Sequence, residues 1–328
     1  MGLSIVAQVE GIYYPILAAV GVPANSLTIA ILSRGKCGLS KCITAYLMAM
    51  AAADLLVLIF SIILYEISEI YFPNCFLNYS IICKPKHVVG FVAVDLSVWL
   101  TVSFTFDRFV AICCPRLRVQ YCTEYTATVV ITTVCTLCIL ENAPIYFAYE
   151  PGKTINDTSW YCNLKSSFYT TEGWVAYSWA DSILTPCAPL ILIFLFNILT
   201  IKHILVASKI RKSLRGSNNI EKQHDPELQN RRKSIILLVT ISASFILLWM
   251  TAYFYFICVN ITDAQHFGND LSHPLAVMGQ VGYMLQLFSP CTNTFIYAVA
   301  QTKFRIELKC VLCYPFNLIR TCINVSLS

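Results

Sequence analysis

The stretch "TFDRFVAICCPRLR" (residues 105–118) places Asp107 beside Arg108 inside an otherwise apolar run. Charged side chains within a membrane-spanning segment are costly, and where they occur they usually mark a functional site. Pro115, Arg116 and Arg118 follow and end the run. We therefore expect a membrane-spanning helix that ends here, with Asp107 and Arg108 at its functional end.

The composition is that of a membrane protein. The chain has 328 residues, of which 57% are hydrophobic and 12% charged, and its mean hydropathy is +0.65. Soluble globular domains have about 25% charged residues. The N-terminal "MGLSIVAQVE" has neither the basic region nor the cleavage site of a secretory signal, so we expect the first apolar run to act as both targeting signal and anchor.

Seven apolar runs predict seven membrane-spanning helices, because about 20 apolar residues cross a bilayer. The runs cover residues 11–33, 44–66, 85–113, 125–148, 175–204, 233–259 and 273–300. The predicted fold is an all-α membrane protein, a seven-transmembrane helix bundle over residues 11–300 that follows an extracellular N-terminus (1–10). The seventh run contains Gln280, Gln286 and Asn293, so we expect it to face the bundle interior.

The basic residues predict the orientation. Most lysines and arginines follow the first, third, fifth and seventh runs, and the positive-inside rule places these segments in the cytoplasm. The N-terminus is then extracellular, and we expect a multi-pass protein of the plasma membrane. The sequons at Asn78, Asn156 and Asn260 fall on the predicted outer side and are candidate glycosylation sites.

Two cytoplasmic segments are expected. Residues 208–232 are too charged to pack alone, which predicts a cytoplasmic loop. In the tail (301–328), apolar residues at helical spacing predict a short amphipathic eighth helix on the membrane surface; they are Phe304, Leu308, Val311 and Leu312. Cys310 and Cys313 are then placed for palmitoylation, and unmodified interfacial cysteines are the equal alternative.

Of the sixteen cysteines, Cys83 and Cys162 are predicted to lie in the oxidising compartment outside the cell. Cys83 is at the outer start of the third helix, and Cys162 is in the outer loop 149–174. We favour a disulfide between them, which would tie that loop over the bundle. Cys75 is the main competitor for either partner.

Seven helices, an outside N-terminus, Asp107-Arg108 and Cys83 together resemble a rhodopsin-like (class A) G-protein-coupled receptor. The resemblance covers nearly the whole chain, with one characteristic residue or short motif in most of the helices. The further residues that carry it are Asn25, Asp54, Pro189, Phe245, Trp249, Asn293 and Tyr297.

The sequence also departs from the family's pattern. Phe109 replaces the tyrosine after Asp-Arg, and Thr251 and Thr294 replace the prolines of helices six and seven. Kinks at these points must then be weaker or arise from another cause. The missing helix-seven proline, with "PAN" (23–25), is similar to the orphan receptors of the 139/142 group, which are linked to aromatic amino acids and peptides.

The resemblance implies how the inner half couples to a G protein. Arg108 would pair with Asp107 at rest and be released to meet the C-terminal helix of a heterotrimeric G protein. Arg231 stands where many relatives carry a second acidic partner, so we expect a loose resting state. The residues implied to transmit ligand contact are Pro189, Phe245, Trp249, Asn293 and Tyr297.

Asp54 lies deep in an apolar helix, where a lone charge is unfavourable. By resemblance it would form a sodium site with Ser97 and Asn293. A protonated, hydrogen-bonded Asp54 without an ion is the alternative. Apart from this ion we expect no cofactor.

Four acids lie in the outer half of the bundle: Glu66, Asp95, Glu141 and Asp181. Carboxylates in low dielectric take up protons or bind a cation, so we expect an extracellular small molecule or short peptide that is cationic or aromatic, with Glu66 and Asp181 as contacts. Aromatic residues are expected to line the same pocket, core packing being their alternative role; they are Phe91, Trp249, Tyr253, Phe256 and Tyr283.

Other functions fit the sequence less well. A proton-sensing receptor would use the same outer acids without an amine ligand, and a transporter would use them as proton relays. A retinal-binding opsin needs a lysine in helix seven, which is absent between Lys233 and Lys303. The five histidines are scattered, so we expect no enzyme, and the bilayer rather than nucleic acid is the other expected partner.

Overall fold

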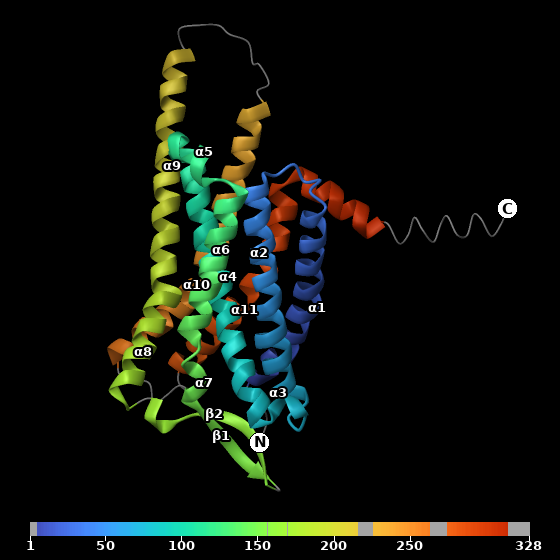
Figure 1. Cartoon of the computed structure of the whole chain (residues 1–328), viewed down its shortest axis with the longest axis vertical. Coiled ribbons are helices and arrows are strands. Elements are labelled where there is room, and N and C mark those ends of the chain that lie inside the picture. The colour runs from blue at the N-terminus through green and yellow to red at the C-terminus, as the bar shows by residue number, and fades with distance from the viewer. Residues whose placement is uncertain (1–4, 156, 169, 216–225, 263–273, 314–328) are drawn as a thin grey trace, which may run out of the picture.

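The computed structural model describes residues 5–155, 157–168, 170–215, 226–262 and 274–313. It is a bundle of long helices that run side by side (Figure 1). Six helical segments of the described chain are long and apolar enough to cross a membrane; they are Ile5–Ser33, Lys41–Tyr71, Ser80–Cys113, Glu124–Ala148, Glu172–Ala207 and Ile235–Val259.

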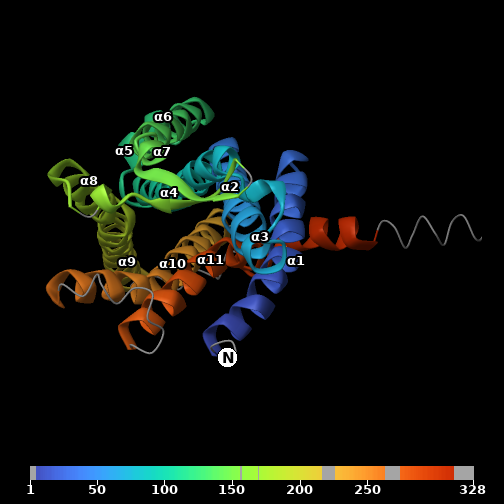
Figure 2. The ribbon, with the colours of Figure 1, turned by 90° about the horizontal axis from the view of Figure 1, so that it is seen from below.

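The seventh helix, α11 (Pro274–Ala300), is less apolar but has the length to cross. Its 27 residues extend about 40 Å at 1.5 Å per residue. It packs against α10 (Pro226–Thr262), α1 (Ile5–Ser33) and α2 (Lys41–Val57), as the view along the bundle shows (Figure 2). Ser289, Asn293 and Thr294 are buried there, so the expected position of this helix inside the bundle is confirmed.

Two spans are interrupted by wider turns. The second span continues from α2 into the π-helix η1 (Leu58–Ile67) and the short α3 (Ser68–Tyr71). The fifth consists of α8 (Glu172–Ser182), the π-helix η4 (Ile183–Cys187) and α9 (Ala188–Arg215). Thr185 leaves the helical region (φ −141°, ψ 92°) because it precedes Pro186, whose ring disfavours the α conformation of its neighbour.

The remaining helices are α4 (Ser80–Cys113), α5 (Pro115–Tyr121), α6 (Glu124–Asn142) and α7 (Ile145–Ala148). After α7, β1 (Tyr149–Ile155) pairs with β2 (Thr158–Leu164) as an antiparallel hairpin at the end of the bundle where α1 begins (Figure 1). A disulfide joins Cys83 in the first turn of α4 to Cys162 in β2, as expected. Ser80 Oγ also donates to the Tyr161 carbonyl at 2.6 Å, so the hairpin is held beside α4.

Several helices extend beyond the expected bounds. α1 begins at Ile5 and α4 at Ser80, so both start earlier than the apolar runs. α9 continues to Arg215 and α10 begins at Pro226, so the helices enter the expected loop 208–232 from both sides. Lysine, arginine, leucine and glutamate are good helix formers, and proline suits a first helical position, which is why charge did not end these helices.

The expected eighth helix is confirmed at residues 302–313, where the chain turns away from the bundle axis (Figure 1). Phe304 is 1% exposed and meets Tyr297 edge to face at 6.0 Å between ring centroids. Leu308 and Val311 also pack against the bundle core. Leu312, expected on the same face, is 51% exposed and does not pack there.

Candidate functional site

Asp107 and Arg108 form an ion pair inside the bundle, at the end opposite the hairpin. Asp107 is fully buried and Arg108 is 6% exposed. Arg108 Nε donates to Asp107 Oδ2 at 2.9 Å, and Arg108 Nη2 contacts the same oxygen. Asp107 Oδ1 accepts from Cys42 Sγ of α2 at 3.2 Å. The carboxylate therefore holds the guanidinium and at the same time joins α4 to α2.

The surroundings of this pair are mostly apolar. The guanidinium carbon of Arg108 lies 5.9 Å from the centre of the Phe104 ring, and Phe109 stacks on Phe196 of α9 at 5.6 Å. Cys122, in the turn between α5 and α6, donates to the Asp107 carbonyl at 3.7 Å. Burial and the nearby Asp107 raise the pKa of the Cys122 thiol to about 11, so it keeps its proton at neutral pH.

The expected second partner position, Arg231, lies in α10, but its side chain is outside the described residues. In the part of the chain that the structure describes, the ion pairs are Lys41–Glu124 and Arg108–Asp107. Asp107 is thus the carboxylate that pairs with Arg108 there.

A packed aromatic cluster lies halfway along the bundle. Phe245 and Trp249 of α10 stack at 5.1 Å between ring centroids, and both contact a core group with Val98 of α4 and Leu190 of α9. Pro189 precedes Leu190 and is buried. Three of the residues expected to transmit a signal, Pro189, Phe245 and Trp249, therefore lie on the neighbouring helices α9 and α10.

Asp54 is the centre of a buried polar group. It is fully buried, Ser97 Oγ donates to its Oδ1 at 2.5 Å, and Asn293 Nδ2 donates to its Oδ2 at 2.7 Å. These bonds join α2, α4 and α11. Tyr297, one helical turn beyond Asn293, is 1% exposed, and its hydroxyl has no hydrogen-bond partner among the described residues.

A cavity of about 390 Å³ opens at the hairpin end of the bundle. Glu66 and Tyr283 line it, as expected, together with Phe91. Its other lining residues include Tyr65, Lys86, His87, Tyr149 and Gln280.

Lys86 is a residue of this cavity that the sequence analysis did not single out. It lies in the second turn of α4, which begins at Ser80, and it is 4% exposed. Its Nζ donates to Asn78 Oδ1 at 3.3 Å and lies 5.4 Å from the centre of the Tyr65 ring. The predicted run begins at residue 85, so it placed Lys86 at the end of the helix and could not show that the side chain is buried.

A second, deeper cavity of about 210 Å³ reaches the aromatic cluster. Asp95, Asp181 and Trp249 line it, and Phe91 and Tyr283 border both cavities. The Nε1 of Trp249 has no hydrogen-bond partner among the described residues.

Two expected pocket residues lie elsewhere. Tyr253 packs beside the Phe245–Trp249 cluster, and Phe256 meets Trp179 edge to face at 6.0 Å. Neither lines the two cavities. Tyr253 has the packing role that was its alternative, and ligand contact by either residue stays a prediction.

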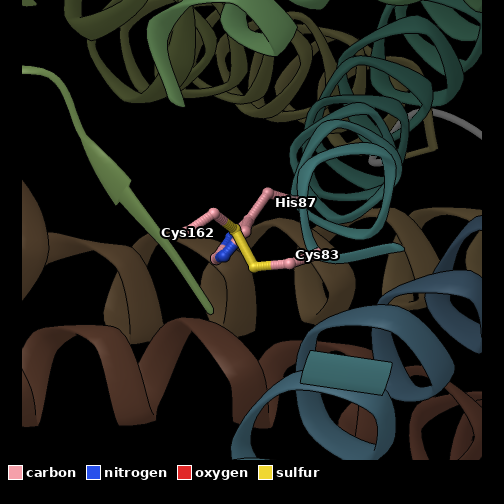
Figure 3. Close-up of side chains that lie close together, drawn as sticks. All are labelled: Cys83, His87 and Cys162. Carbon is pink, nitrogen blue, oxygen red and sulfur yellow. A yellow bond between two sulfur atoms is a disulfide. The ribbon is translucent and has the colours of Figure 1, made fainter. Parts of the chain in front are cut away.

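His87 lies beside the disulfide at the hairpin end of α4. Its side chain points toward the Cys83–Cys162 bond, one turn above Cys83 (Figure 3). The ring also stacks on Tyr149 of β1 at 4.6 Å. Because both sulfurs are bonded to each other, this group is a structural contact and lacks the free thiolates that a metal would need.

The expected modification sites differ in access. Asn78 is 1% exposed, and its Nδ2, the atom that a glycan would occupy, donates to the Pro73 carbonyl at 3.0 Å, so the structure argues against glycosylation there. Asn156 and the side chain of Asn260 lie outside the described residues. Cys310 and Cys313 are both exposed on the eighth helix.

Comparison with known proteins agrees with this geometry. The model of the family described as "7 transmembrane receptor (rhodopsin family)" matches residues 24–297. The FMRFamide receptor of Drosophila melanogaster is 23% identical over 309 residues, which are 90% of this chain and 52% of that receptor. Galanin receptor 2a of Danio rerio is 19% identical over 93% of this chain and 78% of its own length.

A third relative is the tachykinin-like peptides receptor 86C of Drosophila melanogaster, 24% identical over 71% of this chain and 45% of its own length. The chain thus spans about half the length of two of these relatives. The match to the family covers most of the chain, and it includes Asp107-Arg108, the disulfide and the polar group around Asp54. The chain therefore belongs to the rhodopsin family of seven-transmembrane receptors.

Proposed function

We propose that this chain is a G-protein-coupled receptor that binds an extracellular peptide or small molecule with a cationic or aromatic group. It lies in the plasma membrane with its N-terminus outside, and it activates a heterotrimeric G protein. The observation that carries the proposal is that the cavities and the buried ion pair lie toward opposite ends of the bundle. Two acidic, aromatic cavities lie at the hairpin end, and the buried Asp107–Arg108 pair lies at the other.

A peptide is the ligand class that the comparisons favour. The three relatives are named for FMRFamide, galanin and tachykinin-like peptides. Small-molecule pockets are about 300–1,000 Å³, so cavities of about 390 and 210 Å³ suit one or two side chains or a small molecule rather than a whole peptide. The rest of a peptide would lie against the hairpin, whose Tyr149 already borders the outer cavity.

The charge of the cavities supports a cationic group on the ligand. Glu66 lines the outer cavity, and Asp95 and Asp181 line the deeper one. Phe91 and Tyr283 border both, and their ring faces attract a cation or stack on an aromatic side chain. Lys86 supplies one positive charge at the outer cavity, where it would meet an acidic group of the same ligand.

Transmission follows from the aromatic cluster below the deeper cavity. A ligand that moves Trp249 also moves Phe245, because the two rings are stacked and packed against α4 and α9. Movement of the two rings favours an arrangement of the bundle in which α9 and α10 separate and Arg108 leaves Asp107. The ligand shifts this equilibrium only by its difference in affinity for the two arrangements.

The group around Asp54 fits a sodium ion. Asp54 accepts one hydrogen bond on each oxygen and retains free lone pairs, and Ser97 Oγ adds a neutral oxygen ligand. Such an ion would favour the resting arrangement by holding α2, α4 and α11 together. A protonated Asp54 would accept these hydrogen bonds less well than a carboxylate, because Ser97 and Asn293 both donate to its oxygens.

A proton-sensing receptor is the second candidate, because Asp95, Glu141 and Asp181 have carboxylate oxygens within 4.8 Å of one another. The experiment that separates the two is a chimeric G-protein reporter assay at pH 7.4 and under mild acidification, with and without a panel of amines, aromatic amino acids and short basic peptides. Ligand-dependent signalling at pH 7.4 supports the main proposal. Signalling by acid alone that Asp181→Asn abolishes supports the proton sensor instead.

A further inference from the structure

We propose that Asp95, Glu141 and Asp181 form a Ca²⁺ site that links α4, α6 and α8 and lowers the sensitivity of the receptor to its ligand. The regulatory part of the proposal, the lower sensitivity to the ligand, rests on the proposed function. The binding site itself rests on the geometry of the three helices.

The three carboxylates converge from different helices. One oxygen from each lies within 4.8 Å of the others, and Asp95 is 4% exposed. Calcium binds oxygen at about 2.3–2.6 Å, so oxygens on opposite sides of one ion are about 5 Å apart. The separation of the three carboxylate oxygens is therefore that of ligands around a single ion.

A neighbouring amide points to a ligand as well. Asn142 is fully buried, and its Nδ2 donates to Asp95 Oδ2 at 2.6 Å, which directs the amide into the cluster. Its Oδ1 has no hydrogen-bond partner among the described residues, and neither does the buried Oε1 of Glu141. Buried acceptors without a partner are unfavourable; a cation among the carboxylates would satisfy the Glu141 oxygen, and the Asn142 amide would orient the ligating Asp95 carboxylate.

The ligand chemistry selects the ion. All of the candidate ligands are oxygens, which suit calcium or magnesium rather than zinc. Magnesium demands a near-ideal octahedron and keeps several waters, whereas calcium accepts irregular geometry from carboxylates and amide oxygens. Among the ion pairs of the described residues none involves these three acids, so their charge is not balanced by a lysine or arginine there.

The site can be reached from outside. Asp95 and Asp181 line the deeper cavity, which shares Phe91 and Tyr283 with the outer one. Extracellular calcium modules bind at about 10⁻⁴–10⁻³ M, so a site of this kind would respond to extracellular calcium. A bound ion would hold α8 against α4 and α6 and would occupy Asp181, which the cationic ligand also needs.

The binding test uses the purified full chain in detergent, without agonist or G protein. Tb³⁺ replaces Ca²⁺ in oxygen sites, and tryptophans near the cluster sensitise its luminescence. We expect a saturable Tb³⁺ signal at pH 7.4 that Ca²⁺ displaces, with Mg²⁺ much weaker. Glu141→Gln keeps size and shape and should lower Ca²⁺ affinity about tenfold or more, since it removes one of three charged ligands.

Glu150→Gln is the matched control, because Glu150 is an exposed acid in β1 outside the cluster. It should leave the Tb³⁺ signal unchanged. If Glu141→Gln fails to fold, Asp181→Asn gives the same comparison, and thermal unfolding with and without Ca²⁺ reports binding by the unmodified chain. No Tb³⁺ signal and no calcium-dependent stabilisation would overturn the site.

The effect of calcium on signalling is measured in a separate experiment. Raising extracellular Ca²⁺ should reduce agonist potency several-fold in the unmodified receptor and have no effect in Glu141→Gln. Calcium binding without any change in potency would overturn the regulation but not the site. A receptor that signals normally but binds no calcium would overturn this inference and leave the proposed function intact.

Discussion

The Asp107 carboxylate binds Arg108 through one oxygen and Cys42 through the other, within a fully buried site. A guanidinium stays charged under all physiological conditions, so its burial depends on this single carboxylate. Removing one partner of a buried ion pair costs about 3–5 kcal/mol, because the other charge is left uncompensated. The resting position of Arg108 is therefore sensitive to any change at Asp107.

Asp107→Asn should raise ligand-independent signalling. The amide keeps the size of the side chain but removes the charge that holds Arg108, so the arrangement that exposes Arg108 becomes more populated. The measurement is basal G-protein activation normalised to surface expression. Cys42→Ala, which removes the weaker bond to the same carboxylate, is the control and should raise the basal signal much less.

The opposite change, adding a second acidic partner for Arg108, can be made at position 231. Arg231→Glu supplies the acidic residue that many relatives have at the inner end of helix six, and it should lower basal signalling. An unchanged basal signal in both Asp107→Asn and Arg231→Glu would contradict the role assigned to this ion pair.

Asp54→Asn should abolish the effect of sodium on agonist potency. In the unmodified receptor, replacing sodium by choline should increase potency several-fold, because the ion favours the resting arrangement. The variant keeps the hydrogen-bonding geometry with Ser97 but cannot hold the ion. Equal potencies in the two buffers for the unmodified receptor would show that Asp54 carries a proton instead.

Glu66→Gln should weaken activation by cationic ligands about 30-fold or more, because losing one partner of a buried charge pair costs about 2 kcal/mol or more. Neutral aromatic ligands should lose much less. Potency is read from concentration–response curves in the same reporter cells. Glu124→Gln, at an exposed acid at the start of α6 and away from both cavities, serves as the control, and equal losses for both variants would mean that Glu66 does not contact the ligand.

Phe304→Ala should detach the eighth helix from the bundle. The ring is fully buried against Tyr297, and a Phe→Ala change in a core costs about 3 kcal/mol or more. We expect a lower thermal unfolding temperature and less receptor at the surface. Leu312→Ala, at a residue that is 51% exposed on the same helix, should change neither.

The sequence predicted those parts of the molecule that depend on local pattern. Hydropathy predicted the helices, and the spacing of Phe304, Leu308 and Val311 predicted the eighth helix. Asp54 and Asp107 could be singled out because a charge in an apolar run needs a partner. The Cys83–Cys162 bond followed from compartment and resemblance rather than from spacing.

Features that arise from packing between helices were not predictable in this way. Lys86 was not singled out because it is the second residue of the predicted run 85–113, whereas α4 begins at Ser80 and packing against its neighbours buries the side chain. Tyr253 and Phe256 lie on the helix that carries Trp249, yet neither lines the two cavities, and sequence position alone does not give the face of the helix that meets a cavity. The meeting of Glu141 with Asp95 depends on how α6 packs against α4, which no single segment encodes.

The central claim is tested most directly by agonist-stimulated nucleotide exchange on a purified G protein, with the unmodified chain and Arg108→Ala compared at equal amounts of folded receptor. The ligand panel contains short basic and aromatic peptides, amines and aromatic amino acids. We expect at least one of them to stimulate exchange in a saturable manner and Arg108→Ala to abolish that stimulation. Stimulation that persists in full without Arg108, or a folded receptor that no member of the panel activates and that has no basal activity, would contradict it.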